Sequence, residues 1–258
     1  TDVGRRRKLN EDNLLIDRDV HLYAVCDGMG GHNAGEIASK MAIETLHAFI
    51  AKSHGEEKDI TWPYGLEKEL SFEANRLKTA VRLANKRVFK AADNREDYTG
   101  MGTTVVAALV SDSVLTVGSA GDSRCYLLRG DELTQISRDQ TMAQELIDMG
   151  VMRPADTAGT PLEHTLSSSI GGRQTEPVVT RFDLTWDTVV LLCSDGLTRH
   201  VPDERIRERL RTAGSAREAC EGLLEDALRG GGSDNITVVV RRALPRDDGG
   251  GERPGPRA

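Results

Sequence analysis

Aromatic residues are scarce in this chain of 258 residues, because Phe, Trp and Tyr together make up only 4% of it. Proteins that bind nucleic-acid bases by stacking need such side chains. The formal net charge is −7, and an acidic chain is poorly suited to binding nucleic acid or an anionic lipid surface. No run in the sequence approaches the ~20 apolar residues of a membrane-spanning helix. We therefore expect neither a nucleic-acid partner nor a membrane partner.

Cysteine is also sparse, with four residues and no C-x-x-C pair. This argues against a zinc site built from thiolates. Cys26, Cys125 and Cys193 lie inside apolar runs that resemble strands. We expect them to be buried free thiols, as is usual in the reducing cytoplasm.

Several well-known active-site motifs are missing. The sequence contains no G-x-x-x-x-G-K-[ST] loop, no G-x-S-x-G and no H-E-x-x-H, which argues against the phosphate loop, the serine nucleophile and the zinc site that these motifs form. The stretch "GMGGHNAG" (28–35) looks like a nucleotide-binding loop. It departs from G-x-G-x-x-G because its sixth position is Asn33.

The spacing of apolar residues alternates between helical and β-type along the chain. We predict helices over 34–50, 66–88, 139–149, 203–211 and 215–229, the last opened by the capping pair Ser215 and Glu218. We predict two strands within 13–27 and further strands over 103–110, 113–120, 123–130, 131–136, 178–184, 187–194 and 235–242. Strands come in runs, and so do helices. This favours an α+β layered architecture over a doubly wound parallel sheet.

In two segments the apolar residues follow neither the helical nor the β-strand spacing. Residues 151–177 contain Pro, Gly, Ser and Thr, and an irregular segment of that length inside a compact domain is usually functional or mobile. Residues 244–258 are rich in Gly, Pro and charge. This composition predicts a disordered tail.

Acidic residues recur where apolar strands end. Asp27 follows "LYAVC", Asp122 follows "VLTVGSAG", Asp195 follows "VVLLCS", and Asp234 directly precedes "NITVVV". Glu11 and Asp12 form an acidic pair just before the first strand. Taken alone, Asp27-Gly28 is also a common hairpin-turn signal. The repetition across four strand ends favours a shared function.

Carboxylates gathered at one rim of a sheet repel each other and are costly to desolvate. The sequence offers too few basic groups at matching strand ends, so divalent metal is the simplest counter-charge. Oxygen ligands favour hard cations such as Mg²⁺ or Mn²⁺. Two such ions can activate a water for attack on phosphorus. The basic run in "GRRRKLNEDN" (4–13) is either a solvated segment or a source of an arginine that binds phosphate with a bidentate fork.

The motifs now resemble those of a known family. In order along the chain they are "DVGRRRKLNEDN", "DGMGGHNAGEIAS", "GMGTTVVAAL", "GSAGDSRCYLL", "SRDQTMAQELIDMG", "CSDGLTRHV" and "GGGSDNITVVV". The chain is similar to the metal-dependent protein serine/threonine phosphatases of type 2C, the PPM family, in their bacterial form. The resemblance extends from Asp2 to Arg242.

This resemblance implies a fold and a domain organisation. The expected fold is a four-layer αββα sandwich, with two central antiparallel sheets flanked by pairs of helices. The phosphatase domain would span 1–243, with a flap segment at about 138–177, and the tail would span 244–258. The resemblance also implies a cytoplasmic monomer that acts on phosphorylated proteins, the products of a Ser/Thr kinase.

The resemblance further implies a centre of two Mn²⁺ or Mg²⁺ ions. By position, Asp27 looks like the acid that bridges both ions and the carbonyl of Gly28 looks like a ligand of one. Asp195 and Asp234 look like ligands of the other ion. Asp122, together with Asp195, matches a site for a third, weaker metal ion.

Four further residues match supporting positions of the family. Glu11 and Asp12 would hold metal-bound waters or touch the metal directly. Asn235 would support the site through hydrogen bonds. Arg7 matches the arginine that holds the substrate phosphate.

The implied reaction is hydrolysis of phosphoserine or phosphothreonine by a hydroxide that bridges the two metal ions, without a phosphoenzyme. The alternatives are a regulatory or binding module with little activity, and a phosphatase of a small phosphorylated molecule. Three positions depart from the family's usual residues: Met29, Gln140 and Ser168. These departures leave the substrate preference open.

Overall fold

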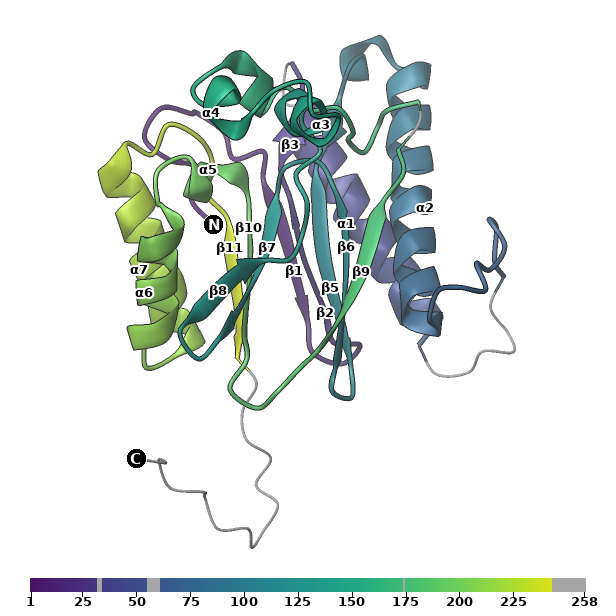
Figure 1. Ribbon diagram of the computed structural model, residues 1–258. Helices are drawn as coiled ribbons and strands as arrows, with labels where there is room; N and C mark the ends of the chain where they lie inside the picture. Colours follow the sequence, from purple (N-terminus) through teal and green to yellow (C-terminus); the bar gives the residue numbers. More distant parts are fainter. Residues whose placement is uncertain (32–33, 55–60, 174, 243–258) are drawn as a thin grey trace, which may run out of the picture.

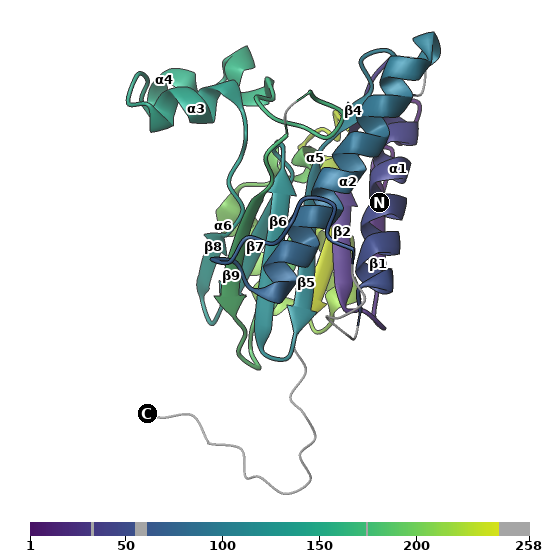
Figure 2. The ribbon, with the colours of Figure 1, turned by 90° about the vertical axis from the view of Figure 1, so that its right-hand side faces the viewer.

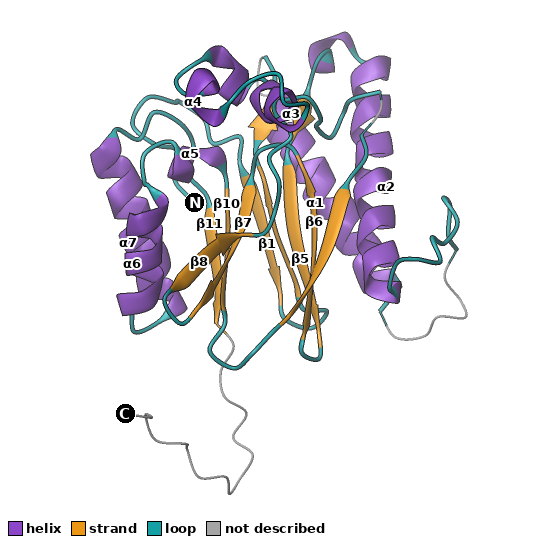
Figure 3. Ribbon diagram, in the orientation of Figure 1, coloured by secondary structure: helices purple, strands orange, loops and turns teal. Residues whose placement is uncertain are grey.

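The computed structural model describes residues 1–31, 34–54, 61–173 and 175–242 (Figure 1). The tail predicted for 244–258 lies outside the described residues. Two β-sheets stand face to face, with α1 and α2 covering one outer face and α6 and α7 covering the other (Figures 1 and 3). This arrangement confirms the predicted αββα sandwich.

Both large sheets are antiparallel throughout. One has the strand order β1-β2-β5-β6-β9 and the other has the order β11-β10-β7-β8. The first comprises β1 Asn13–Asp17, β2 Leu22–Cys26, β5 Val105–Ser111, β6 Val114–Ala120 and β9 Val178–Asp183; the second comprises β7 Arg124–Arg129, β8 Glu132–Gln135, β10 Val189–Cys193 and β11 Val238–Arg242. A short separate pair, β3 Gly28–Met29 and β4 Gly102–Thr103, lies beyond the end of β2.

The period-2 alternation of each strand supplies two apolar layers at once. In β2, Ala24 and Cys26 join the cluster that packs under α1 and α2, while Val25 joins the cluster between the two sheets. From the opposite sheet, Val190 and Leu192 complete that inner cluster. Cys26, Cys125 and Cys193 are free and fully buried, as the sequence predicts.

Two pairs of helices form the outer layers. They are α1 Ala34–Lys52 with α2 Phe72–Asn94, and α6 Asp203–Thr212 with α7 Ala216–Gly230. The Ser215 side chain accepts a hydrogen bond from the backbone N–H of Glu218, so the predicted N-cap of α7 is confirmed. Among the described residues, no helix is both long enough and apolar enough to cross a membrane.

The second helix begins later than the apolar spacing predicts. Ser71 caps α2 by accepting the backbone N–H of Ala74, and the Asn75 amide donates to three carbonyls of the preceding turn, those of Glu67, Leu70 and Ser71. These bonds hold residues 66–70 in a non-helical conformation just before α2. Leu66 and Leu70 match the helical spacing of the apolar residues in α2, but they lie before the helix begins.

The predicted final strand is also shorter, because β11 begins at Val238 rather than at residue 235. Residues before it make other contacts: Ile236 forms an isolated β-bridge with Asp2 near the N-terminus. This bridge brings the N-terminal segment beside the start of β11. Gly4 and Arg7 of this segment lie against Asp234.

The segment predicted to be irregular contains short helices. After α3 Met142–Asp148 come α4 Pro154–Thr157 and a 3₁₀ turn at Pro161–His164; another 3₁₀ turn, Glu96–Tyr98, follows α2. The segment projects beyond the end of the sandwich where β2, β6 and β10 finish (Figure 2). Isolated bridges join Thr141 to Leu166 and Thr103 to Ile170. The first bridge joins the two arms of the projecting segment to each other, and the second attaches the segment to β4.

Candidate metal centre

A cavity of about 410 Å³ opens at the end of the sandwich where the acidic motifs meet. Every predicted site residue except Asp12 lines it: Arg7, Glu11, Asp27, Gly28, Asp122, Asp195, Asp234 and Asn235. His164, Leu166 and Ser169 of the projecting segment also reach the cavity. Segments that are far apart in sequence converge here, because β2, β6 and β10 end at this side of the sandwich and their antiparallel neighbours β1 and β11 begin there.

The backbone of Asp27 is fixed where β2 ends. Its N–H donates to Thr104 Oγ1 at 3.0 Å, and its carbonyl accepts from Thr104 N at 2.8 Å and from Thr103 Oγ1 at 2.8 Å. Burial raises the pKa of Asp27 well above its usual range, and the charges of Asp12 and Asp195 add to the rise. This carboxylate is thus repelled by neighbouring acids, and no described side chain forms an ion pair with it.

Gly28 is required by close packing. A Cβ built on it would lie 2.2 Å from the Gly35 carbonyl oxygen and 2.5 Å from the Glu11 carbonyl oxygen. Gly28 lies in extended β3 and pairs with Thr103. The alternative interpretation of Asp27-Gly28 as a hairpin turn is therefore wrong, and the glycine brings the Asp27 backbone close to the start of α1.

Asp12 lies behind the cavity, with only 7% of its surface exposed. Its Oδ2 accepts a hydrogen bond from Ser194 Oγ at 2.8 Å, while its buried Oδ1 has no donor among the described residues. Burial raises the pKa of Asp12 to about 6, and Asp195 and Asp234 contribute to the rise. A buried carboxylate oxygen without a donor suits a hydrated cation, which supplies both charge and hydrogen bonds.

Asp122 follows β6 in a tight loop. Gly121 before it has φ +102°, and a Cβ there would lie 2.7 Å from the Thr104 methyl carbon. The Gly121 N–H donates to the Gln140 side chain at 3.0 Å. Burial raises the pKa of Asp122 to about 7, and repulsion from Asp195 and Asp139 adds to the rise.

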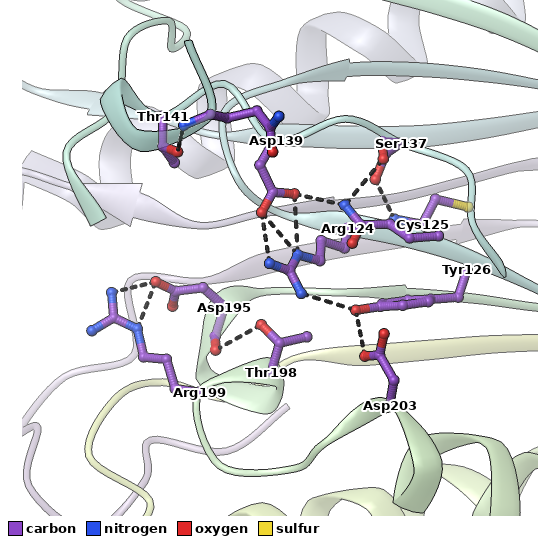
Figure 4. Close-up of polar contacts among 12 residues, drawn as sticks. Arg124, Cys125, Tyr126, Ser137, Asp139, Thr141, Asp195, Thr198, Arg199 and Asp203 are labelled. Atoms are coloured by element: carbon purple, nitrogen blue, oxygen red, sulfur yellow. Dashed lines mark hydrogen bonds and ion pairs between the residues drawn. The ribbon is translucent and has the colours of Figure 1, made fainter. Parts of the chain in front are cut away.

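Two arginines form ion pairs with Asp234 and Asp195. Arg7 forms a fork on Asp234, with Nε 2.8 Å from Oδ1 and Nη2 2.9 Å from Oδ2. Arg199 Nε donates to Asp195 Oδ2 at 2.7 Å, and Nη2 donates to the same oxygen (Figure 4). Half of the Arg7 side chain is exposed, so it can leave Asp234 for a ligand in the cavity.

The Asn235 side chain connects the N-terminal segment to the residues just before β11. Its Oδ1 accepts the Glu11 N–H at 2.9 Å, and its Nδ2 donates to the carbonyls of Val3 and Leu9 at 3.0 and 2.9 Å. These three bonds span the loop that carries Arg7. They hold both Arg7 and Glu11 at the rim of the cavity.

The donor set fits hard divalent cations, although the acids are not gathered into a finished ligand set. In the described part of the chain, no three Asp, Glu, His or Cys side chains already converge as a metal-binding group. The evidence for the fit is chemical: the lining acids offer oxygen donors, Asp27 and Asp122 are repelled by their neighbours, and Asp12 has an unpaired oxygen. Cations that bind through oxygen would relieve all three conditions.

Sequence reasoning missed Arg199. The signal was present, because Arg199 stands four residues after Asp195 and the (i, i+4) spacing joins side chains on one helical face. The intervening residues form α5 Asp195–Thr198. The helix was too short to be recognised from apolar periodicity.

The three residues that depart from the family pattern have distinct positions. Met29 lines the cavity and is 36% exposed. Besides accepting from Gly121, Gln140 donates from Nε2 to the Glu176 carbonyl at 3.3 Å. The Ser168 hydroxyl is buried without a hydrogen-bond partner among the described residues.

The raised pKa values predict how pH affects stability without metal. At pH values above the usual pKa of ~3.9, Asp12 and Asp122 keep their protons in the folded chain but lose them in the unfolded chain. The free energy of unfolding therefore falls as pH rises toward their folded pKa values of about 6 and 7. We expect the Tm in chelator to fall as pH rises from about 4 to about 7. Mn²⁺ should raise the Tm more at the higher pH, because cations bind the deprotonated carboxylates.

Thermal unfolding measured across this pH range, with and without Mn²⁺, checks the prediction. Asp122→Asn is the matched control, since it should reduce the slope of Tm against pH in chelator. An equal slope in the two proteins would contradict the assignment of the raised pKa to Asp122.

Comparison with known proteins gives a consistent result. The family described as Protein phosphatase 2C matches residues 4–229. The chain is 38% identical over 249 residues to the serine/threonine protein phosphatase PstP of Mycobacterium tuberculosis, covering 96% of this chain but only 45% of that protein. It is 34% identical to the serine/threonine phosphatase stp of Listeria innocua, covering 93% of this chain and 92% of that protein. The chain therefore spans about half the length of the PstP protein it matches.

Solved structures give the same fold. A crystal structure of M. tuberculosis PstP/Ppp aligns with a TM-score of 0.79 at 38% identity, covering 93% of this chain and 94% of that one. The catalytic domain of PstP in complex with two manganese ions aligns with a TM-score of 0.77, also at 38% identity and with the same coverage. From the family match over most of its length, together with these relatives, the chain belongs to the protein phosphatase 2C family.

Proposed function

We propose that this chain is a metal-dependent phosphatase that hydrolyses phosphoserine and phosphothreonine in proteins. The observation that carries the proposal is the set of strand-end acids in one cavity, where burial and mutual repulsion raise the pKa of Asp27 and Asp122, with the raised pKa of Asp12 directly behind them. Membership of the family supports it, as does the complex of the PstP catalytic domain with two manganese ions. The metal is Mn²⁺ or Mg²⁺, because the donors are hard oxygens.

In this proposal each acid has a separate position around two metal ions. Asp27 would hold both ions, the Gly28 carbonyl would hold one, and Asp195 and Asp234 would hold the other. Glu11 and Asp12 hold the surrounding waters. The carboxylates would offset the positive charge of the ions. When bound, the pair of ions supplies Lewis acidity, which lowers the pKa of a water and offsets the charge of the phosphate.

The residues of the chain orient the substrate. Arg7 is held on Asp234 by a two-bond fork, and the same fork geometry fits two phosphate oxygens. Asn235 fixes the loop that carries Arg7. Arg7 therefore already lines the cavity, where its guanidinium can exchange Asp234 for a phosphate.

A cysteine nucleophile is not supported by the geometry. Burial raises the pKa of Cys193 to about 12 and that of Cys26 above its ordinary value. A thiolate is the nucleophilic form of cysteine, and neither thiol lines the cavity among the described residues. Direct attack by water, without a phosphoenzyme, is the proposed route.

Replacing Arg7 by Ala should mainly weaken substrate binding. We expect the KM for a phosphothreonine peptide to rise by roughly 10-fold or more, the scale of a lost charge-assisted contact, with a smaller change in kcat. Steady-state kinetics at saturating Mn²⁺ checks this. Arg6→Ala is the matched control: Arg6 is exposed and adjacent, and its loss should leave KM unchanged. A fall in kcat with unchanged KM would contradict the role given to Arg7.

The substrate class is tested by comparing two kinds of phosphate ester. We propose that the projecting segment within about 138–177 acts as a flap that contacts the polypeptide around the phosphorylated residue, in the products of a cytoplasmic Ser/Thr kinase. A phosphothreonine peptide should then have a higher kcat/KM than p-nitrophenyl phosphate. Equal values would favour a phosphatase of small molecules, and turnover of neither ester with any divalent metal would favour a regulatory module.

A further inference from the structure

Arg199 lies at the edge of the cavity, at the end of a single helical turn. Its backbone N–H donates to the Asp195 carbonyl at 2.9 Å, which closes the turn of α5 and brings the two side chains onto the same side. The Arg199 side chain is 31% exposed and that of Asp195 is 12% exposed. Their ion pair is therefore partly protected from water, which strengthens it relative to a surface pair.

The pair uses only one oxygen of the carboxylate. Both bonds from Arg199 go to Asp195 Oδ2, and Oδ1 receives no hydrogen bond from the described residues. Figure 4 shows the guanidinium against one side of the carboxylate. The arrangement leaves Oδ1 for the metal pair while Arg199 holds the other oxygen.

A second cavity of about 490 Å³ adjoins the metal centre on this side. Asp122, His164, Asp195 and Arg199 line both cavities. Asp139 also lines the second one, but its charge is used by Arg124, whose Nη2 lies 2.7 Å away. Among the described side chains, Asp122 has no hydrogen-bonded or ion-paired cation, although the charge of Arg199 lowers its pKa against the larger effect of burial.

We propose that Arg199 is a positioning residue that takes the place of a third divalent ion beside Asp122 and Asp195. The inference rests on the proposed metal centre and concerns only its occupancy. A third ion would have to break a two-bond, partly buried ion pair and then remain next to a fixed positive charge. The guanidinium is part of the chain, so its positive charge is present at this position whatever the concentration of divalent ions. This chain therefore binds two divalent ions and excludes a third at ordinary metal concentrations.

The number of Mn²⁺ ions bound per chain tests the inference directly. Equilibrium dialysis of the whole chain, followed by metal analysis at Mn²⁺ concentrations from about 10 µM to a few mM, should give two ions for the wild type. Arg199→Gln removes the charge and should bind a third. Arg199→Lys retains the charge and should return to two. Arg205→Gln is the matched control, since Arg205 pairs with Asp226 on the helical layer and should not change the count.

A double variant locates the extra ion. Asp122→Asn in the Arg199→Gln background should remove the third ion, whereas Asp122→Asn alone should bind the same number as the wild type. Thermal unfolding verifies that each variant is folded, and the single Asp122→Asn variant keeps the test decisive if Arg199→Gln does not fold.

The outcomes separate the two claims. Three ions in the wild type, a loss of one ion in Asp122→Asn alone, or no gain in folded Arg199→Gln would overturn the inference while leaving the two-metal centre in place. No Mn²⁺ bound by the wild type at any concentration would instead overturn the proposed function, on which the inference depends.

Discussion

Asp27→Asn should nearly abolish metal-dependent phosphate release, with a loss of about 10²–10³-fold, the scale of removing one preorganised group that stabilises the transition state. The replacement is nearly isosteric, and the backbone of Asp27 is held by Thr103 and Thr104 independently of its side chain. The fold should therefore persist. In chelator, the variant should be more stable than the wild type, because it removes a buried charge that Asp12 and Asp195 repel.

Phosphate release at saturating Mn²⁺ and the Tm in chelator are the two measurements. Asp226→Asn is the matched control, because Arg209 and Arg205 lower the pKa of Asp226 and it lies in α7, away from the cavity. That variant should lose stability and keep its activity. An Asp27→Asn protein that turns over normally, or that melts at a lower temperature in chelator, would show that Asp27 is not a repelled ligand of metal.

Asp234→Ala has the second-largest expected effect. It removes a proposed ligand of one metal ion and also the carboxylate that holds Arg7 in a fork. We expect turnover at about 1 mM Mn²⁺ to fall by at least ~10²-fold, at the upper end of the losses that follow changes around a metal site. Because only one of the two proposed ions loses a ligand, the variant should still bind the other.

Activity and bound Mn²⁺ measured together separate this effect from misfolding. Asp187→Ala is the matched control: Asp187 is exposed and lies before β10, at the opposite end of that strand from Asp195. Normal turnover by Asp234→Ala would show that the metal assignment at this position is wrong.

The strand-end acids could be located from sequence because they follow from local rules. An apolar run that ends in Asp places the carboxylate at the end of a strand, and β2 and β6, which lie on either side of antiparallel β5, finish at the same end of their sheet. The structure gathers Asp27, Asp122, Asp195 and Asp234 around one cavity. Their metal roles stay predictions.

Features that depend on a few specific hydrogen bonds could not be predicted in this way. The start of α2 is set by the Ser71 cap and by the Asn75 amide, which override the continued apolar spacing of Leu66 and Leu70. The late start of β11 follows from the pairing of Ile236 with Asp2. This pairing joins the two ends of the described chain and leaves no local signal.

Arg199 illustrates a different limit. Its spacing from Asp195 was visible, but the pairing needs the helical turn of α5, which spans only Asp195–Thr198. A turn of that length has no apolar period. Its consequence for metal binding depends on Asp122, which a separate strand brings to the same cavity.

The central claim is that the strand-end acids hold the metal that drives hydrolysis. It is tested most directly by phosphate release from a phosphothreonine peptide, measured with Mn²⁺ and then after addition of EDTA. The account predicts steady release with Mn²⁺, its loss in EDTA and its recovery when excess Mn²⁺ is added back. Release that continues unchanged in EDTA, or no release with any divalent metal, would contradict it.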